Sequence, residues 1–153
     1  MSTQKTKECQ IVFEISNEIA NKIGGIYTVI ASKAAEMQRL FGPGNYIAIG
    51  LYNSFKARND FEELELPKDF EEAISKVRAE GIDVKYGRWI GGGNVETFLV
   101  DPSYLLDVPL VTGKAERKID QIKRSLWDWF QIDSLWMPEV FDPMVAFGWG
   151  VGC

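Results

Sequence analysis

The chain has 153 residues, of which 46% are hydrophobic and 25% are charged, and its formal net charge is −5. This length and balance are typical of one globular domain with a sizeable core. The acidic balance argues against a nucleic-acid partner, since such proteins usually carry a basic excess. No stretch approaches the roughly 20 apolar residues of a membrane helix, so we expect no membrane partner either.

The sequence contains no histidine, which removes the commonest general base and the commonest metal ligand. Ser–His–Asp triads, Cys–His pairs and histidine zinc sites are therefore excluded, and no metal site is predicted. The two cysteines, Cys9 and Cys153, lie at opposite ends, and residues Met1 to Gln10 show no signal-peptide core. We expect both to be free thiols in a reducing cytoplasm. The sequence does not specify an oligomeric state.

A strand, a glycine turn and a helix are predicted first along the chain. The apolar run Ile11 to Ile15 is followed by Gly24-Gly25 and by an amphipathic stretch, Ile26 to Leu40. The helical period predicts a buried stripe on this helix. Its members are Ile26, Val29, Ile30, Met37 and Leu40, with Ala34 between them.

The middle of the chain predicts further strands and one more helix. Gly42-Pro43-Gly44 ends the first helix, and a buried strand parallel to the first is expected after it. A triple glycine followed by Asn94 indicates a hairpin turn between two later strands, with a phosphate loop as the alternative. The expected segments are a strand at Asn45 to Ile49, a polar connection at Asn53 to Pro67, a helix at Lys68 to Glu80, and strands at Val84 to Ile90 and Val95 to Val100.

The last third predicts one helix, Ala115 to Phe130, and an aromatic cluster. The basic residues of that helix favour a solvated face over a binding patch; they are Lys114, Arg117, Lys118, Lys123 and Arg124. Four tryptophans favour a buried cluster, with a sugar-stacking platform as the alternative; they are Trp127, Trp129, Trp136 and Trp149. The segment Gly148 to Gly152 is too rich in glycine to predict a good helix.

The strand, turn and helix around Gly24-Gly25 are the arrangement with which α/β folds bind anions. Backbone N–H groups at the helix start point outward, and the helix dipole adds about half a positive charge there. The two glycines allow a phosphate to approach the backbone, and Lys22 can supply a mobile charge. A plain tight turn is the competing interpretation. Neither the Rossmann fingerprint nor the P-loop signature occurs here, which argues against a dinucleotide enzyme and a Walker-type ATPase.

The nine residues Asn21 to Val29 resemble a block of the eukaryotic-type glycogen synthases, and the likeness covers most of residues 10 to 148 in order. The further matching segments are Phe13 to Ala20, Ser32-Lys33-Ala34, Asn45 to Gly50, Tyr86-Gly87-Arg88-Trp89 and Leu126-Trp127.

The resemblance implies an α/β fold that is one partial, Rossmann-like N-terminal domain, residues 1–153, of a two-domain GT-B glycosyltransferase. It implies a retaining glucosyltransferase that moves glucose from UDP- or ADP-glucose onto the 4-hydroxyl of an α-1,4-glucan, without metal or other cofactor. Lys22, Gly24 and Gly25 would then contact the donor phosphates.

Departures from the family lead to an expectation about the chain by itself. The family carries a histidine near the sugar, which this sequence lacks, so no catalytic residue is assigned within it. The second, nucleotide-sugar-binding domain is also expected to be absent, so we expect the 153-residue chain alone to be inactive. The alternative is a stand-alone module that binds a sugar phosphate, a nucleotide or a protein without catalysis.

Overall fold

The computed structural model describes residues 11–107, 117–134 and 138–153. Its strands are β1 (Val12–Ile15), β2 (Tyr46–Leu51), β3 (Phe61–Glu63), β4 (Asp83–Trp89) and β5 (Val95–Asp101). Its helices are α1 (Gly25–Phe41), α2 (Ser54–Ala57), α3 (Lys68–Ala79), α4 (Ser103–Leu106), α5 (Lys118–Phe130) and α6 (Pro138–Gly152). The predicted α/β class is confirmed.

The five strands form one mixed sheet in the order β1-β2-β5-β4-β3. The predicted parallel pairing of the first two strands is confirmed, with Phe13 opposite Ile47. β2 also pairs in parallel with β5, whereas β4 is antiparallel to both β5 and β3. The carboxyl ends of β1, β2 and β5 therefore meet at one edge, which is where α/β folds place ligands.

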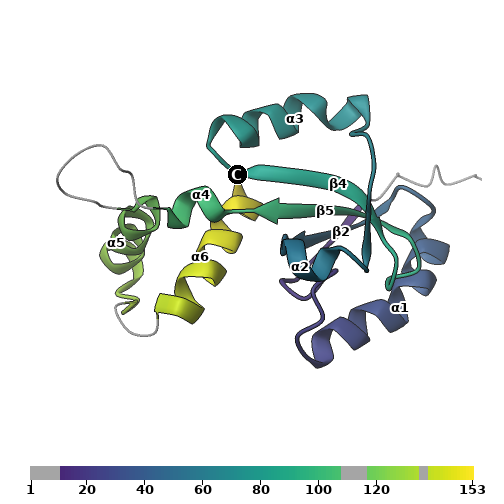
Figure 1. The fold of residues 1–153 in the computed structure, drawn as a ribbon, viewed down its shortest axis with the longest axis horizontal. Coiled ribbons are helices and arrows are strands. Elements are labelled where there is room, and N and C mark those ends of the chain that lie inside the picture. Colours follow the sequence, from purple (N-terminus) through teal and green to yellow (C-terminus); the bar gives the residue numbers. More distant parts are fainter. Residues whose placement is uncertain (1–10, 108–116, 135–137) are drawn as a thin grey trace, which may run out of the picture.

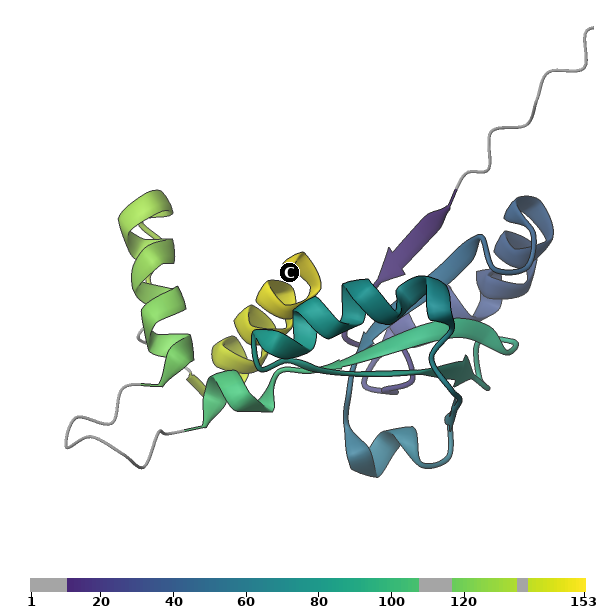
Figure 2. The same ribbon diagram turned by 90° about the horizontal axis from the view of Figure 1, so that it is seen from above.

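Helices cover both faces of the sheet. Figure 1 shows α1 below the sheet and α3 above it, and α6 packs against the same side-chain cluster of the sheet as α3. Figure 2 shows the same arrangement from above. The side chains of β2 alternate between two clusters, because successive residues of a strand point to opposite faces. Ile47 belongs to the cluster under α3 and α6, and Tyr46 and Ala48 belong to the cluster under α1.

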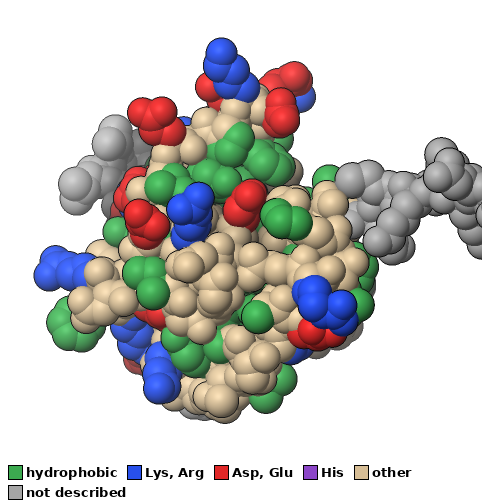
Figure 3. All heavy atoms as spheres, turned by 90° about the vertical axis from the view of Figure 1, so that its right-hand side faces the viewer, with side chains coloured by type: hydrophobic (Ala, Val, Ile, Leu, Met, Phe, Trp, Pro, Cys, Tyr) green, Lys and Arg blue, Asp and Glu red, His purple; other side chains and the backbone are tan. Residues whose placement is uncertain are grey.

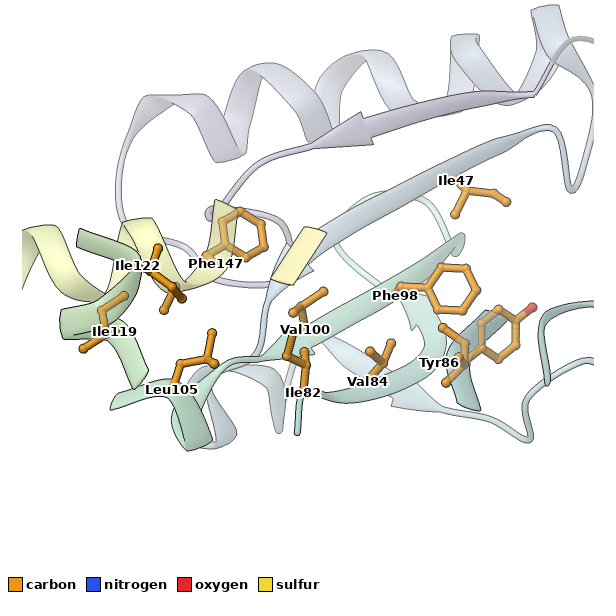
Figure 4. Packing of buried hydrophobic residues seen from close by; sticks show 12 residues of the cluster. Ile47, Ile82, Val84, Tyr86, Phe98, Val100, Leu105, Ile119, Ile122 and Phe147 are labelled. Carbon is orange, nitrogen blue, oxygen red and sulfur yellow. The ribbon is translucent and has the colours of Figure 1, made fainter. Parts of the chain in front are cut away.

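The larger cluster extends from the sheet to the last two helices. Figure 4 shows Phe98 and Val100 of the sheet, Phe147 of α6, and Ile119 and Ile122 of α5 in one continuous group. The helix α5 is thus attached to the domain by apolar contacts from its buried face.

The predicted stripe of α1 is only partly correct. Ile30 is buried, and Met37 packs against the core, as expected. Ile26, Val29 and Leu40, however, are each at least half exposed. Ala34 is also buried, as expected, but the buried face is rotated, because Tyr27, Ala31 and Phe41 pack against the core in place of those three residues. A 3.6-residue period fixes the spacing of a stripe, but packing against the sheet decides which of the neighbouring apolar faces is buried.

The middle of the chain contains two elements that the sequence did not predict. The expected polar connection, Asn53 to Pro67, includes the one-turn helix α2 and the edge strand β3. Asn53 caps α2 through its side-chain oxygen, which accepts hydrogen bonds from the amides of Phe55 and Lys56. The hairpin between β4 and β5 is confirmed, and Asn94 adopts a positive φ of 60° in its turn.

The final helix, α6, contradicts the expectation for Gly148 to Gly152. This segment is helical, and the reason lies in packing against β5. A Cβ on Gly150 would lie 2.9 Å from Cγ1 of Val100, so the missing side chain lets the helix approach the sheet closely. Tertiary contact therefore outweighs the weak helix propensity of glycine.

The expectation of a solvated basic face on α5 is wrong for two residues. Lys123 is buried, and its ammonium lies 2.7 Å from Oδ1 of Asp142 on α6. Arg117 donates to Oδ2 of the same carboxylate at 2.8 Å, and it also pairs with Asp120. These cations balance a buried acid between two helices, a role that local charge patterns do not reveal. Lys114 lies outside the described residues.

The predicted burial of the late tryptophans is also wrong. Trp127, Trp129 and Trp149 are all exposed, and Trp136 lies outside the described residues. Among the tryptophans that the structure describes, Trp89 at the end of β4 is the buried one. No helix within the described ranges has both the length and the apolar character needed to cross a bilayer. On the face shown in Figure 3, basic side chains are dispersed among acidic and hydrophobic ones.

Candidate functional site

The candidate site lies where β1 ends and α1 begins, at the carboxyl edge of the parallel strands. Residues 16–24 connect the two elements, and Gly24 is the extended residue that precedes α1. The helix has no side-chain cap from Gly24, so its first amides require acceptors from elsewhere.

Glu18 supplies one such acceptor. Its Oε2 accepts hydrogen bonds from the amides of Gly24, at 2.8 Å, and Tyr27, at 3.0 Å, and the residue is only 8% exposed. A carboxylate at a helix start is stabilised by the helix dipole as well as by these bonds. The turn is therefore an anion-binding position, and one internal anion already uses part of it. The sequence analysis assigned Glu18 no role.

The two glycines differ in their surroundings. A Cβ on Gly24 would lie 3.3 Å from Oε1 of Glu18, whereas a Cβ on Gly25 would meet nothing within 4 Å. Helix geometry leaves the amides of Gly25 and Ile26 without intrahelical acceptors. The free space beside the turn is therefore at Gly25 rather than at Gly24.

Two lysines lie at this turn. The ammonium of Lys22 lies 5.6 Å from the ring centroid of Tyr27, within the range of a cation–π contact. Lys56 of α2 donates to the carbonyl oxygen of Lys22 at 3.5 Å. Lys56 was not singled out from the sequence. The signal available was its place just after β2, whose carboxyl end lies beside that of β1.

Asp60 holds the surrounding elements together. Its Oδ2 accepts from the hydroxyl of Tyr27 at 2.8 Å and from Nε1 of Trp89 at 2.9 Å. Its Oδ1 accepts from the amide of Gly91 at 2.8 Å. Burial, together with this neighbouring carboxylate, raises the pKa of Tyr27 above its ordinary value, so the hydroxyl keeps its proton. Asp60 thereby ties the first turn of α1 to the hairpin turn. This favours the interpretation of the triple glycine as a hairpin turn over its interpretation as a phosphate loop.

The connection before Lys22 carries two unfavourable local features. Ala20 adopts a positive φ of 52°, a conformation that residues with a Cβ rarely accept. Among the described residues, Oδ1 of Asn21 is the one buried side-chain oxygen or nitrogen without a hydrogen-bond partner. Such features persist where the surrounding structure imposes them, and they cluster at functional sites.

Metal binding and disulfide pairing receive no support within the described part of the chain. No group of three or more cysteine or acidic side chains there is arranged to hold a metal ion. Cys153 is a free, exposed cysteine, as expected, while Cys9 lies outside the described residues. At the turn itself, the amides of the first helical turn and the ammonium groups of Lys22 and Lys56 are the groups that suit an anion.

Comparison with known proteins identifies the family. The family model described as glycogen synthase matches residues 14–152. The chain is 31% identical over 140 residues to the glycogen [starch] synthase of Neurospora crassa, covering 91% of this chain and 18% of that protein. It is 29% identical over 139 residues to the human liver glycogen [starch] synthase, covering 90% of this chain and 18% of that protein. Its match to the rat liver glycogen [starch] synthase is 36% identical over 94 residues, covering 61% of this chain and 13% of that protein.

The chain thus spans less than a fifth of the length of the curated relatives that it matches. The match covers the turn at Gly24-Gly25, the strands β2 to β5 and the helices α5 and α6. The chain therefore belongs to the glycogen synthase family.

Proposed function

We propose that this chain is the N-terminal portion of a glycogen synthase, a retaining glucosyltransferase. The enzyme would move glucose from UDP- or ADP-glucose onto the 4-hydroxyl of an α-1,4-glucan. The observation that carries this proposal is the family match across residues 14–152. In the proposal, residues 1–153 form one partial domain of a two-domain GT-B enzyme that works in the cytoplasm. The second domain would come from sequence outside these residues.

The role proposed for this chain is to hold the donor's diphosphate at Lys22, Gly24 and Gly25. Three features support it: the open space at Gly25, the outward amides of the first helical turn, and the ammonium of Lys22 close by. As the bond from the glucose to the diphosphate breaks, negative charge grows on the leaving phosphate. A preorganised lysine and helix start near that charge lower the barrier, because they interact more strongly with the transition state than with the donor.

No catalytic residue is assigned within this chain. Retaining transfer requires a closed cleft that excludes water, and these residues supply one wall of it. We therefore expect the purified 153-residue polypeptide to incorporate no labelled glucose into glycogen.

The donor site can be tested on the 153-residue chain by titrating UDP and following backbone amide signals by NMR. We expect roughly millimolar binding, with shifts at Gly25 and Ile26. Lys22→Ala should weaken it about ten-fold, because one charge-assisted phosphate contact is lost. Gly25→Val should weaken it similarly by blocking the backbone, although the space around Gly25 lets the fold accept the side chain.

Lys76→Ala is the matched control. Lys76 is an exposed lysine of α3 that pairs with Glu72. Lys76→Ala changes the net charge as much as Lys22→Ala does. The affinity for UDP should nevertheless stay unchanged in Lys76→Ala. Equal affinity in the wild type, Lys22→Ala and Gly25→Val would show that the glycine pair is only a turn.

A further inference from the structure

The strand β1 forms one edge of the sheet. It pairs with β2 on one side, and no other strand of the described residues lies on its far side. Figure 2 shows β1, in purple, at this margin of the sheet. An unpaired edge presents a row of backbone N–H and C=O groups that another strand can bind. Natural edge strands are often protected by proline, by lysine or by a bulge, and β1 contains none of these.

The free backbone groups of this edge belong to alternate residues. In the parallel pairing, the amides of Val12 and Ser16 donate to carbonyl oxygens on the β2 side, at 2.7 and 3.0 Å. The residues between them direct their backbone groups to the opposite side, because the pattern alternates along a strand. The N–H and C=O groups of Phe13 and Ile15 therefore point away from the sheet. They offer two donors and two acceptors in one row.

The side chains at the free edge are apolar and lie outside the core. Ile11, Phe13 and Ile15 are each about half exposed, and none of them belongs to either buried cluster. They point to the same face of the sheet, because the side chains of a strand alternate between its faces. Ile47, which lies opposite Phe13 on β2, is buried on that face. The apolar surface therefore continues from the core to the edge.

Charge does not prevent a close approach to this edge. Glu14, the acidic residue of β1, points to the opposite face, where Lys33 of α1 lies 2.9 Å from its Oε1. The hydroxyl of the buried Tyr46 donates to its Oε2, also at 2.9 Å. A strand that pairs with β1 would therefore meet an apolar face on one side and a neutralised carboxylate on the other. Both conditions favour association at an edge strand.

We propose that the free edge of β1 binds the same edge of a second copy of this chain, so that two sheets join into one. Copies related by a two-fold axis present identical surfaces to each other, and their edge strands then run antiparallel. A register centred on Phe13 aligns the outward backbone groups of both strands. It places Phe13 opposite Phe13 of the second copy, and Ile11 opposite Ile15 of that copy.

This register also matches the side chains. All of the facing side chains lie on one face of the joined sheet, where they form an apolar cross-strand group. The edge is thus complementary to itself in hydrogen bonding, in apolar character and in charge, which is why a second copy is the partner that it fits. The contact uses none of the residues proposed to hold the donor's phosphates.

The test is analytical ultracentrifugation of the 153-residue chain over a range of concentrations. We expect a dimer at roughly 100 μM that dissociates on dilution, since the contact is small. Phe13→Lys should weaken the dimer about ten-fold or more, because two apolar side chains are lost and like charges then face each other. Phe55→Lys is the matched control, since Phe55 is 80% exposed on α2, and it should leave the dimer unchanged.

A second variant tests the backbone hydrogen bonds. Ile15→Pro removes an outward N–H that β2 does not use, and edge strands accept proline at such positions. It should also weaken the dimer about ten-fold or more, while circular dichroism shows that both variants are folded. In the wild type, hydrogen exchange at the amides of Phe13 and Ile15 should slow as the protein concentration rises, because the dimer protects them.

Three results would overturn the proposal. The first is a chain that is monomeric at every concentration. The second is a dimer in which the exchange of the Phe13 and Ile15 amides does not depend on concentration. The third is a dimer that persists in folded Phe13→Lys or Ile15→Pro but dissociates in Trp129→Lys, because the contact would then lie on the exposed side of α5.

Discussion

Asp60 offers the sharpest test of how this domain holds its glycine turn. Its carboxylate accepts hydrogen bonds from Tyr27 of α1, from Trp89 of β4 and from the Gly91 amide in the hairpin turn. Asp60→Ala would remove both acceptor oxygens, and with them three hydrogen bonds, and leave the N–H of the fully buried Trp89 unpaired. Each lost bond costs about 1 kcal/mol, so the loss of unfolding free energy should be about 3 kcal/mol.

Graded variants make this argument quantitative. In Asp60→Asn, the remaining oxygen can keep the bonds to Tyr27 and Trp89, but the amide NH₂ would then face the Gly91 N–H. We expect a loss of about 1.5 kcal/mol. Tyr27→Phe removes one bond and should lose about 1 kcal/mol. Tyr104→Phe is the matched control, since the Tyr104 side chain is largely exposed, and it should lose almost nothing.

The measurement is urea and thermal unfolding followed by circular dichroism. For a domain of this size, 3 kcal/mol corresponds to a fall in Tm of about 10 °C. The fall should follow the order Asp60→Ala, then Asp60→Asn, then Tyr27→Phe. If the free energy of unfolding of Asp60→Ala lies within about 1 kcal/mol of the wild-type value, the three hydrogen bonds do not hold α1 to the hairpin, and the reasoning is wrong.

Two further predictions concern charge. Glu18→Gln keeps an oxygen for the amides of Gly24 and Tyr27 but removes a negative charge next to the proposed phosphate position. UDP should therefore bind about five-fold more tightly, because like charges repel. Weaker binding in the NMR titration would contradict this. The hydrogen bond from Arg117 lowers the pKa of Asp120 below its ordinary value of 3.8. The stability from this pair is therefore present above about pH 4 and is lost as the pH falls further. Asp120→Asn should be less stable than the wild type at pH 6, and the difference should shrink towards pH 2 in urea unfolding; a difference that is constant with pH would refute the assignment.

Local patterns were enough to predict the elements that depend on neighbouring residues. The parallel pairing of Ile11 to Ile15 with Asn45 to Ile49 followed from two apolar runs separated by one helix, and the hairpin followed from the glycines at Gly91 to Gly93. The turn at Gly24-Gly25 was recognised in the same way, because a strand, two glycines and a helix are contiguous in sequence.

Tertiary structure decided what depends on partners distant in sequence. Lys56 and Asp60 reach the glycine turn from the connection after β2, through contacts that no periodicity encodes. The rotated face of α1 places Tyr27, Ala31 and Phe41 against the core, although Ile26, Val29 and Leu40 have the same helical spacing. Lys123 of α5 faces inward and pairs with Asp142, whereas Trp127 of the same helix is exposed. Hydrophobicity predicts that a side chain favours burial, but only the packing of the whole domain determines whether a neighbour is present to bury it.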